Sequence, residues 1–225
     1  MKIIISAIFA LFSLAITAQE QALDAATKMD TLFKPNYPEG VYLTKEAFLN
    51  KKPVIRTVWP VDVGRSEIVV QENIAHTCFF YGSNREKITD VFAVSYKGNL
   101  YFQLKGIFKN CNKNDRNESS NIHNSFVRVI LGGENYFYTE AELANAWAKG
   151  FAYGAIGGGV GSVLAQSYIH GKGIVWDFKN QEFNIFKNCN DYNEFISVVY
   201  PEGVLDCKSK KINPYAIRKV IDIIK

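Results

Sequence analysis

The chain has 225 residues, of which 48% are hydrophobic and 14% aromatic, and its formal net charge at pH 7 is +4. This length is enough for one sizeable domain with a buried core. The positive charge is too weak to indicate a nucleic-acid partner, so none is expected.

The amino terminus has the pattern of a secretory signal peptide over residues 1–18. Lys2 supplies a positive first region, residues 3–16 form a mainly apolar run, and cleavage is expected between Ala18 and Gln19. The run is shorter than the roughly 20 residues that span a bilayer, so a retained anchor helix is the less favoured alternative. The first cysteine is Cys78, which argues against a lipid-modified amino terminus. We therefore expect export to the periplasm, the outer membrane or the exterior.

The first part of the mature chain predicts a helix and then short strands. Helical spacing of apolar residues indicates a leading helix or linker over 19–36, ahead of a single domain over 37–225. Thr44 is placed to cap a brief helix that ends at Leu49. Strands rich in β-branched and aromatic residues are predicted at 41–43, 55–59, 67–71 and 77–81.

Three β-hairpins are predicted further along the chain. In residues 90–104, 126–138 and 174–186, two apolar runs flank a short polar or glycine-containing turn. Between the first two hairpins, residues 110–124 are crowded with Asn, Asp, Lys and Ser, and they predict an exposed loop. Repeated hairpins indicate an antiparallel sheet.

Helix starts are predicted at three places. Thr139 with Glu142 and Asp191 with Glu194 have capping-box spacing, and the first pair is expected to start a helix that runs into glycine-rich sequence. A last helix is expected to begin at Pro214 after an Asn213 cap, with an apolar stripe that includes Ile217 and Ile221. The fold class expected is α+β, with an antiparallel hairpin-rich sheet, a glycine-rich helix and terminal helices.

Residues 150–169 form a glycine-rich segment without charged side chains. Its small residues fall in two rows with a spacing of four: Gly150, Gly154, Gly158 and Ser162, and then Gly157 and Gly161. On a helix, such rows give smooth faces that another backbone can approach closely. Three interpretations stay open: packing inside the protein's own fold, membrane association or self-association, and a loop, since each glycine weakens a helix.

The four cysteines are candidates for disulfides in an exported chain. Cys189 and Cys207 flank one short predicted helix, so they are the favoured pair. The bonding of Cys78 and Cys111 stays open.

Several segments resemble a family of exported proteins from Bacteroidota, especially flavobacteria. The opening motif, Tyr-Pro-Glu-Gly-Val-Tyr-Leu-Thr-Lys-Glu-Ala-Phe-Leu-Asn-Lys-Lys-Pro at residues 37–53, is similar to the start of these proteins, and residues 92–102, 125–130 and 174–178 are similar to later segments. The resemblance implies a bacterial origin and export, and it carries no known activity. In the opening motif, Tyr42 and Phe48 are expected to pack under the sheet.

The residues do not define a reaction. Ser162 lacks a base nearby, since His170 is expected two turns further along the same helix. His76, His123 and His170 are too scattered to indicate a metal site, and the glycines do not match a nucleotide fingerprint. Asp177 is expected to face solvent. No catalytic residue, cofactor or metal is therefore assigned.

The function expected from the sequence is that of an exported, non-enzymatic envelope protein that binds an unknown partner. Two alternatives remain: a membrane-associated homo-oligomer packed through the glycine rows, and a hydrolase of envelope material. A pocket that joins Asp177 to a histidine would favour the hydrolase. The cluster of Lys208, Lys210 and Lys211 is interpreted as a solvated turn, with anionic envelope polymers as the alternative ligand.

Overall fold

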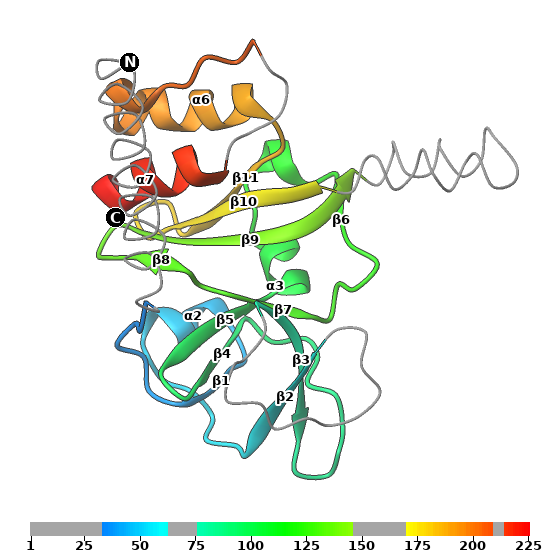
Figure 1. Cartoon of the computed structure of the whole chain (residues 1–225). Coiled ribbons are helices and arrows are strands. Elements are labelled where there is room, and N and C mark those ends of the chain that lie inside the picture. Colours follow the sequence, from blue (N-terminus) through cyan, green and yellow to red (C-terminus); the bar gives the residue numbers. More distant parts are fainter. Residues whose placement is uncertain (1–32, 63–75, 146–169, 209–213) are drawn as a thin grey trace, which may run out of the picture. The chain divides into compact units, whose positions relative to one another are not determined.

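The computed structural model describes residues 33–62, 76–145, 170–208 and 214–225, and within them the chain forms two antiparallel sheets (Figure 1). The first sheet has the strand order β1-β4-β5-β7-β3-β2: β1 (Gly40–Tyr42), β4 (Ala93–Tyr96), β5 (Asn99–Gln103), β7 (Phe126–Arg128), β3 (Thr77–Gly82) and β2 (Val58–Asp62). The second has the order β11-β10-β9-β6, with β8 also paired to β9: β11 (Glu182–Phe186), β10 (His170–Asp177), β9 (Tyr136–Asn145), β6 (Glu118–Ser119) and β8 (Leu131–Gly132). The predicted α+β class is confirmed.

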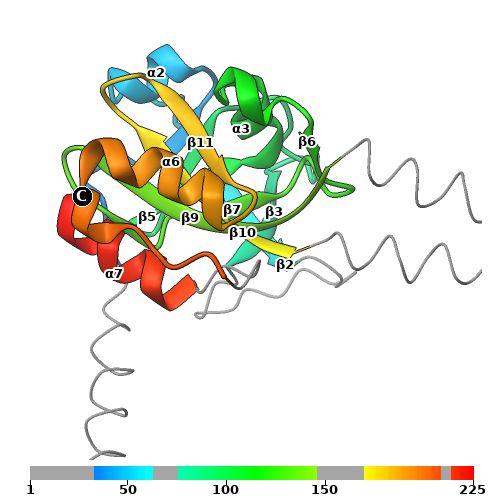
Figure 2. The same ribbon diagram turned by 90° about the horizontal axis from the view of Figure 1, so that it is seen from above.

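Helices accompany both sheets. The described helices are α2 (Lys45–Leu49), α3 (Leu104–Lys109), α6 (Cys189–Val199) and α7 (Pro214–Ile224), with the short turns η1 (Lys113–Asp115) and η2 (Pro201–Gly203). Figures 1 and 2 both show α6 and α7 beside the second sheet, where α6 contacts β11 and α7 contacts β8 and β9. Ile196 of α6 and Ile217 and Ile221 of α7 are buried there against Tyr138 and Val175. The apolar stripe predicted for the last helix is confirmed. No helix in the described ranges has the length and apolar character that crossing a membrane requires.

A cluster of aromatic rings joins the two sheets. Phe48 of α2 is fully buried, and its ring centre lies 5.4 Å from that of Phe102 in β5 and 5.8 Å from that of Trp176 in β10. Tyr42 is also fully buried, with its ring 6.0 Å from Phe48. The expected packing of Tyr42 and Phe48 is confirmed, and it explains why the Tyr-Leu-Thr-x-x-x-Phe pattern ends on a large apolar ring.

The chain passes directly from one sheet to the other after β7. The Val129 N–H donates to the Leu100 carbonyl of β5, whereas the next N–H, that of Ile130, donates to Tyr138 of β9. The Thr139 hydroxyl of β9 donates to the carbonyl of Arg128 at 2.6 Å. Two neighbouring residues therefore bond to different sheets.

Two predicted hairpins are confirmed and one is partly wrong. β4 pairs with β5 and β10 pairs with β11. In the middle hairpin only β8 pairs with β9, since β7 pairs with β3 and β5 in the other sheet. Residues 126–128, at the start of the predicted middle hairpin, therefore belong to the first sheet. The local sequence does not specify this pairing.

The helix predicted to start at Thr139 is wrong. Thr139 and Glu142 lie in β9, which continues to Asn145, and His170 begins β10 opposite Leu143. Residues 139–145 contain several good helix formers, but pairing with β10 along eight residues overrides that weak preference. His170 is therefore a strand residue and does not follow Ser162 on one helix.

Other boundaries differ in smaller ways. The cap of α6 is Asn188, whose side chain accepts from the N–H groups of Asn190 and Asp191, so the predicted Asp191 cap is wrong. Thr44 caps α2 as predicted. Residues 110–124 include η1 and β6 with a buried Asp115, so they are more ordered than the predicted exposed loop. The predictions that fall outside the described residues are the signal peptide with Ala18 and Gln19, the leading helix up to residue 32, the strand at 67–71, the glycine rows (Gly150, Gly154, Gly157, Gly158, Gly161, Ser162) and the Asn213 cap.

The predicted disulfide between Cys189 and Cys207 is confirmed, and it joins the start of α6 to the segment after η2. Cys78 is a buried thiol in β3, and Cys111 is a partly buried thiol.

Replacing both Cys189 and Cys207 with serine is expected to lower the free energy of unfolding by about 3 kcal/mol. The bond closes a loop with a sequence separation of 18, and a cross-link of that span restricts the unfolded chain by about this amount. Urea unfolding followed by circular dichroism measures the loss. Cys111→Ser is the control, since it removes a thiol outside the bond. Equal losses in both variants would contradict the prediction.

Candidate functional site

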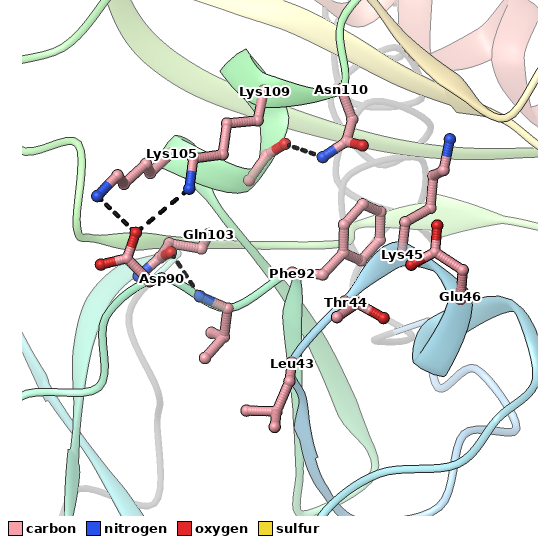
Figure 3. Close-up of a pocket in the computed structure, with 12 residues that line it drawn as sticks. Leu43, Thr44, Lys45, Glu46, Asp90, Phe92, Gln103, Lys105, Lys109 and Asn110 are labelled. Atoms are coloured by element: carbon pink, nitrogen blue, oxygen red, sulfur yellow. Dashed lines mark hydrogen bonds and ion pairs between the residues drawn. The ribbon is translucent and has the colours of Figure 1, made fainter.

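A cleft of about 250 Å³ lies between α2, α3 and the segment before β4. Figure 3 shows Lys105 and Lys109 of α3 pointing toward Asp90, with Lys45 of α2 on the other side of the Phe92 ring. The cleft is lined by Leu43, Thr44, Lys45, Glu46, Asp90, Val91, Phe92, Gln103, Lys105, Gly106, Lys109 and Asn110. Three ammonium groups and two carboxylates therefore meet at one opening.

Gln103 fixes the wall of the cleft that carries Asp90. This side chain is fully buried, and its Oε1 accepts the Val91 N–H at 3.1 Å while its Nε2 donates to the Ile88 carbonyl. Gly106 brings α3 close to the same segment, because a Cβ at this position would lie 3.0 Å from the Val91 oxygen. A buried amide and a close helix contact therefore set the distance between α3 and Asp90.

Asp90 joins the two lysines of α3. Its Oδ1 lies 2.6 Å from Lys105 Nζ and 3.3 Å from Lys109 Nζ. Lysines four apart lie on the same side of a helix, so both reach one carboxylate. The hydrogen bonds from Lys105 and Lys109 lower the pKa of Asp90. Asp90 has a φ of 55°, in the left-handed region that Asp and Asn tolerate best among side chains with a Cβ. One carboxylate opposite two ammonium groups leaves a positive charge at this point.

A second cavity of about 630 Å³ adjoins the cleft, and Leu43, Asp90 and Val91 line both. It adds Arg56, Glu86 and Lys87 to the charged lining. We call the combined surface the basic groove. Its five basic side chains (Lys45, Arg56, Lys87, Lys105, Lys109) outnumber its three acidic ones (Glu46, Glu86, Asp90), which gives a net charge of +2.

A cleft of about 600 Å³ beside β11 and α6 is of a different kind. Its buried Asp115 accepts from the Ile185 N–H at 2.7 Å and lies 2.8 Å from Lys187 Nζ. Lys187 also donates to the Asn114 carbonyl. The Asp115 and Lys187 side chains are only 3% and 24% exposed, so this ion pair joins η1 to β11 within the fold.

A fourth cavity, of about 380 Å³, is lined in part by His76 and Glu140. His76 Nε2 donates to the Glu140 carbonyl at 2.7 Å, so this nitrogen carries a proton. The Glu140 carboxylate receives two hydrogen bonds from Arg218 of α7, at 2.7 and 2.8 Å, and one from the Tyr138 hydroxyl. Burial alone raises the pKa of Glu140, but Arg218 and Tyr138 outweigh it and lower the pKa. The arrangement ties β3 and α7 to β9.

The free energy of unfolding is expected to fall as the pH drops below 6.5. Burial lowers the pKa of His76 from its ordinary 6.5. In the interval below that value, the unfolded chain therefore binds a proton that the folded chain does not, and stability rises with pH. Glu140 contributes in a separate interval below 4.5, because its lowered pKa makes its stabilisation disappear only at more acidic pH.

The variant His76→Gln keeps an N–H donor for Glu140 and removes the titrating ring. Urea unfolding at about pH 5.5 and about pH 7 should show a smaller pH dependence in the variant than in the wild type. The same dependence in both proteins would assign it to another group.

The structure does not support the catalytic and metal-binding roles that were considered for single residues of the sequence. Asp177 is 4% exposed, and its carboxylate accepts from the N–H groups of Lys179 and Asn180. The expectation that Asp177 faces solvent is wrong, because it stabilises the β10–β11 turn. Across the described part of the chain, no group of three or more His, Cys, Asp and Glu side chains is placed to hold a metal ion.

The basic groove was not predicted from the sequence. Its only local signal is the spacing of Lys105 and Lys109, which is common on exposed helices. Lys45, Arg56 and Asp90 come from other segments, and only the fold brings them together. Comparison of the chain with family models, with curated proteins and with solved structures gives no match.

Proposed function

We propose that this protein is an exported, non-enzymatic binding protein of the cell envelope, and that its basic groove holds an anionic polymer. The observation that carries the proposal is the charge of the groove, where five basic and three acidic side chains line two adjoining cavities. Basic side chains spread over two adjoining cavities suit an extended ligand with charges along its length. Such a ligand places several anionic groups against several cations at once, which raises affinity without a deep pocket.

The exported location rests on three features. The amino-terminal sequence has the order of a signal peptide, and the resemblance of residues 37–53 to exported Bacteroidota proteins agrees with it. The Cys189–Cys207 disulfide is typical of an oxidising compartment. In that compartment, acidic polysaccharides and other anionic polymers are accessible partners for the groove.

Binding is favoured over catalysis by the composition of the groove. The described residues that line it include neither histidine, the most frequent general acid or base, nor cysteine, a frequent nucleophile. The lysines instead lie on the rim, with side chains 35% exposed for Lys105 and 61% exposed for Lys109. The hydrolase and the oligomer packed through the glycine rows stay alternatives drawn from the sequence.

The double variant Lys105→Gln/Lys109→Gln is expected to weaken binding of polygalacturonate by at least about tenfold. Each ammonium near a ligand carboxylate contributes roughly 1 kcal/mol in a water-like dielectric, so two losses multiply. Isothermal titration calorimetry with the purified protein at about 0.01 M ionic strength measures the affinity, and binding should weaken in about 0.15 M salt because of screening.

The matched control is Lys208→Gln/Lys219→Gln, which removes the same charge from exposed positions outside the groove. It should change the affinity by less than about twofold. An equal loss in both double variants would assign binding to overall charge and would reject the groove. Absence of binding by the wild type would reject an anionic polymer of this kind.

A further inference from the structure

We infer that Asp90 occupies the position where a carboxylate of the ligand binds, and that the ligand displaces it. This inference rests on the proposed function and deepens it, because it names the ligand group as a carboxylate and the ligand class as a polymer of uronic acids. It also assigns Asp90 as the residue that limits the affinity of the groove.

The geometry shows a carboxylate already held by the cleft. Asp90 Oδ1 is within 2.6 Å of Lys105 Nζ and 3.3 Å of Lys109 Nζ, so both ammonium groups converge on one oxygen. Figure 3 shows this oxygen between the two lysine side chains. A ligand carboxylate that reached the same two ammonium groups would take the same place.

The backbone keeps Asp90 in this place without locking it there. Gln103 holds the neighbouring Val91 N–H, and the left-handed φ of Asp90 turns its side chain relative to the strand that follows. The Asp90 carboxylate is therefore held beside the lysines at a high effective concentration. A free anion with no other contacts must exceed this concentration to take its place. The Asp90 side chain is nevertheless 55% exposed, and ion pairs of this exposure are weak. A ligand with further contacts to Lys45, Arg56 and Lys87 can displace it.

Direct competition has a quantitative signature. Removal of Asp90 should raise the affinity for a single uronic acid and for its polymer by the same factor, because each ligand fills the position once. A general charge effect would favour the polymer instead, since the polymer carries more charge.

The experiment compares galacturonate and polygalacturonate binding to the wild type, Asp90→Asn and Asp90→Gly. Both substitutions tolerate a positive φ, so a folding defect in one leaves the other informative. The control is Asp222→Asn, whose side chain is 56% exposed and pairs with Lys225 on α7. We expect the Asp90 variants to bind both ligands about fivefold more tightly, and the control to bind them as the wild type does.

Three results would overturn the inference. These are unchanged or weaker binding in the Asp90 variants, a larger gain for the polymer than for the monomer, and an equal gain in Asp222→Asn. The proposed function fails separately, when Lys105→Gln/Lys109→Gln binds polygalacturonate as tightly as the wild type. If the lysine variant loses binding and the Asp90 variants gain none, the groove is the site and Asp90 is not its competitor.

Discussion

Replacing Phe48 with alanine is expected to lower the free energy of unfolding by about 3–5 kcal/mol, the usual cost of removing a fully buried ring. Phe48 is 0% exposed and contacts rings from both sheets, including Phe102 and Trp176. Loss of the Phe48 ring leaves a cavity lined by rings from both sheets. Side chains of one sheet alone cannot fill such a cavity. Urea unfolding measured by fluorescence gives the change.

Val198→Ala is the control for this prediction. Val198 is 84% exposed on α6, so its truncation should change the free energy of unfolding by less than about 0.5 kcal/mol. If Phe48→Ala cost no more than the control, the ring cluster would not be what holds the two sheets together.

Replacing Lys172 with methionine is expected to cost about 3–5 kcal/mol of stability. Lys172 Nζ lies 2.6 Å from Glu118 Oε2, and the two side chains are only 9% and 1% exposed. Methionine fills a similar volume but leaves the buried Glu118 carboxylate without its counter-charge. The cost therefore comes from the charge that stays behind and not from lost packing.

The double variant Lys172→Met/Glu118→Leu distinguishes these two causes. Removing both charges should restore most of the stability, because an apolar pair avoids the desolvation of two ions. Thermal and urea unfolding of the wild type, the single variant and the double variant complete the comparison. A double variant less stable than Lys172→Met would show that the ion pair contributes more than it costs to bury.

Features that depend on neighbouring residues were predictable from the sequence. The first hairpin turn needs positive φ at two successive residues, and Lys97 with Gly98 has 48° and 72°; glycine makes such a turn accessible. The Thr44 cap, the apolar stripe of α7 and the Cys189–Cys207 pair have similarly short-range signals.

Features that depend on distant partners were not predictable. Residues 139–145 have a helical composition, and only β10 makes them a strand. The strand order places β7 between β5 and β3, which nothing in residues 126–128 specifies. The ion pairs of Asp90 also depend on distant partners, because both lysines lie on α3, a helix that was not predicted from the sequence. The candidate site could therefore be found only after the fold was known.

The transfer of the chain between sheets after β7 sets a limit on how the protein can be divided. The Val129 N–H bonds to β5 and the Ile130 N–H bonds to β9, so a single peptide bond carries the chain from one sheet to the other. A fragment that ended at Val129 would contain Phe48 without Trp176, and the remaining fragment would contain Trp176 without Phe48. We therefore expect the two sheets to unfold together as one cooperative unit.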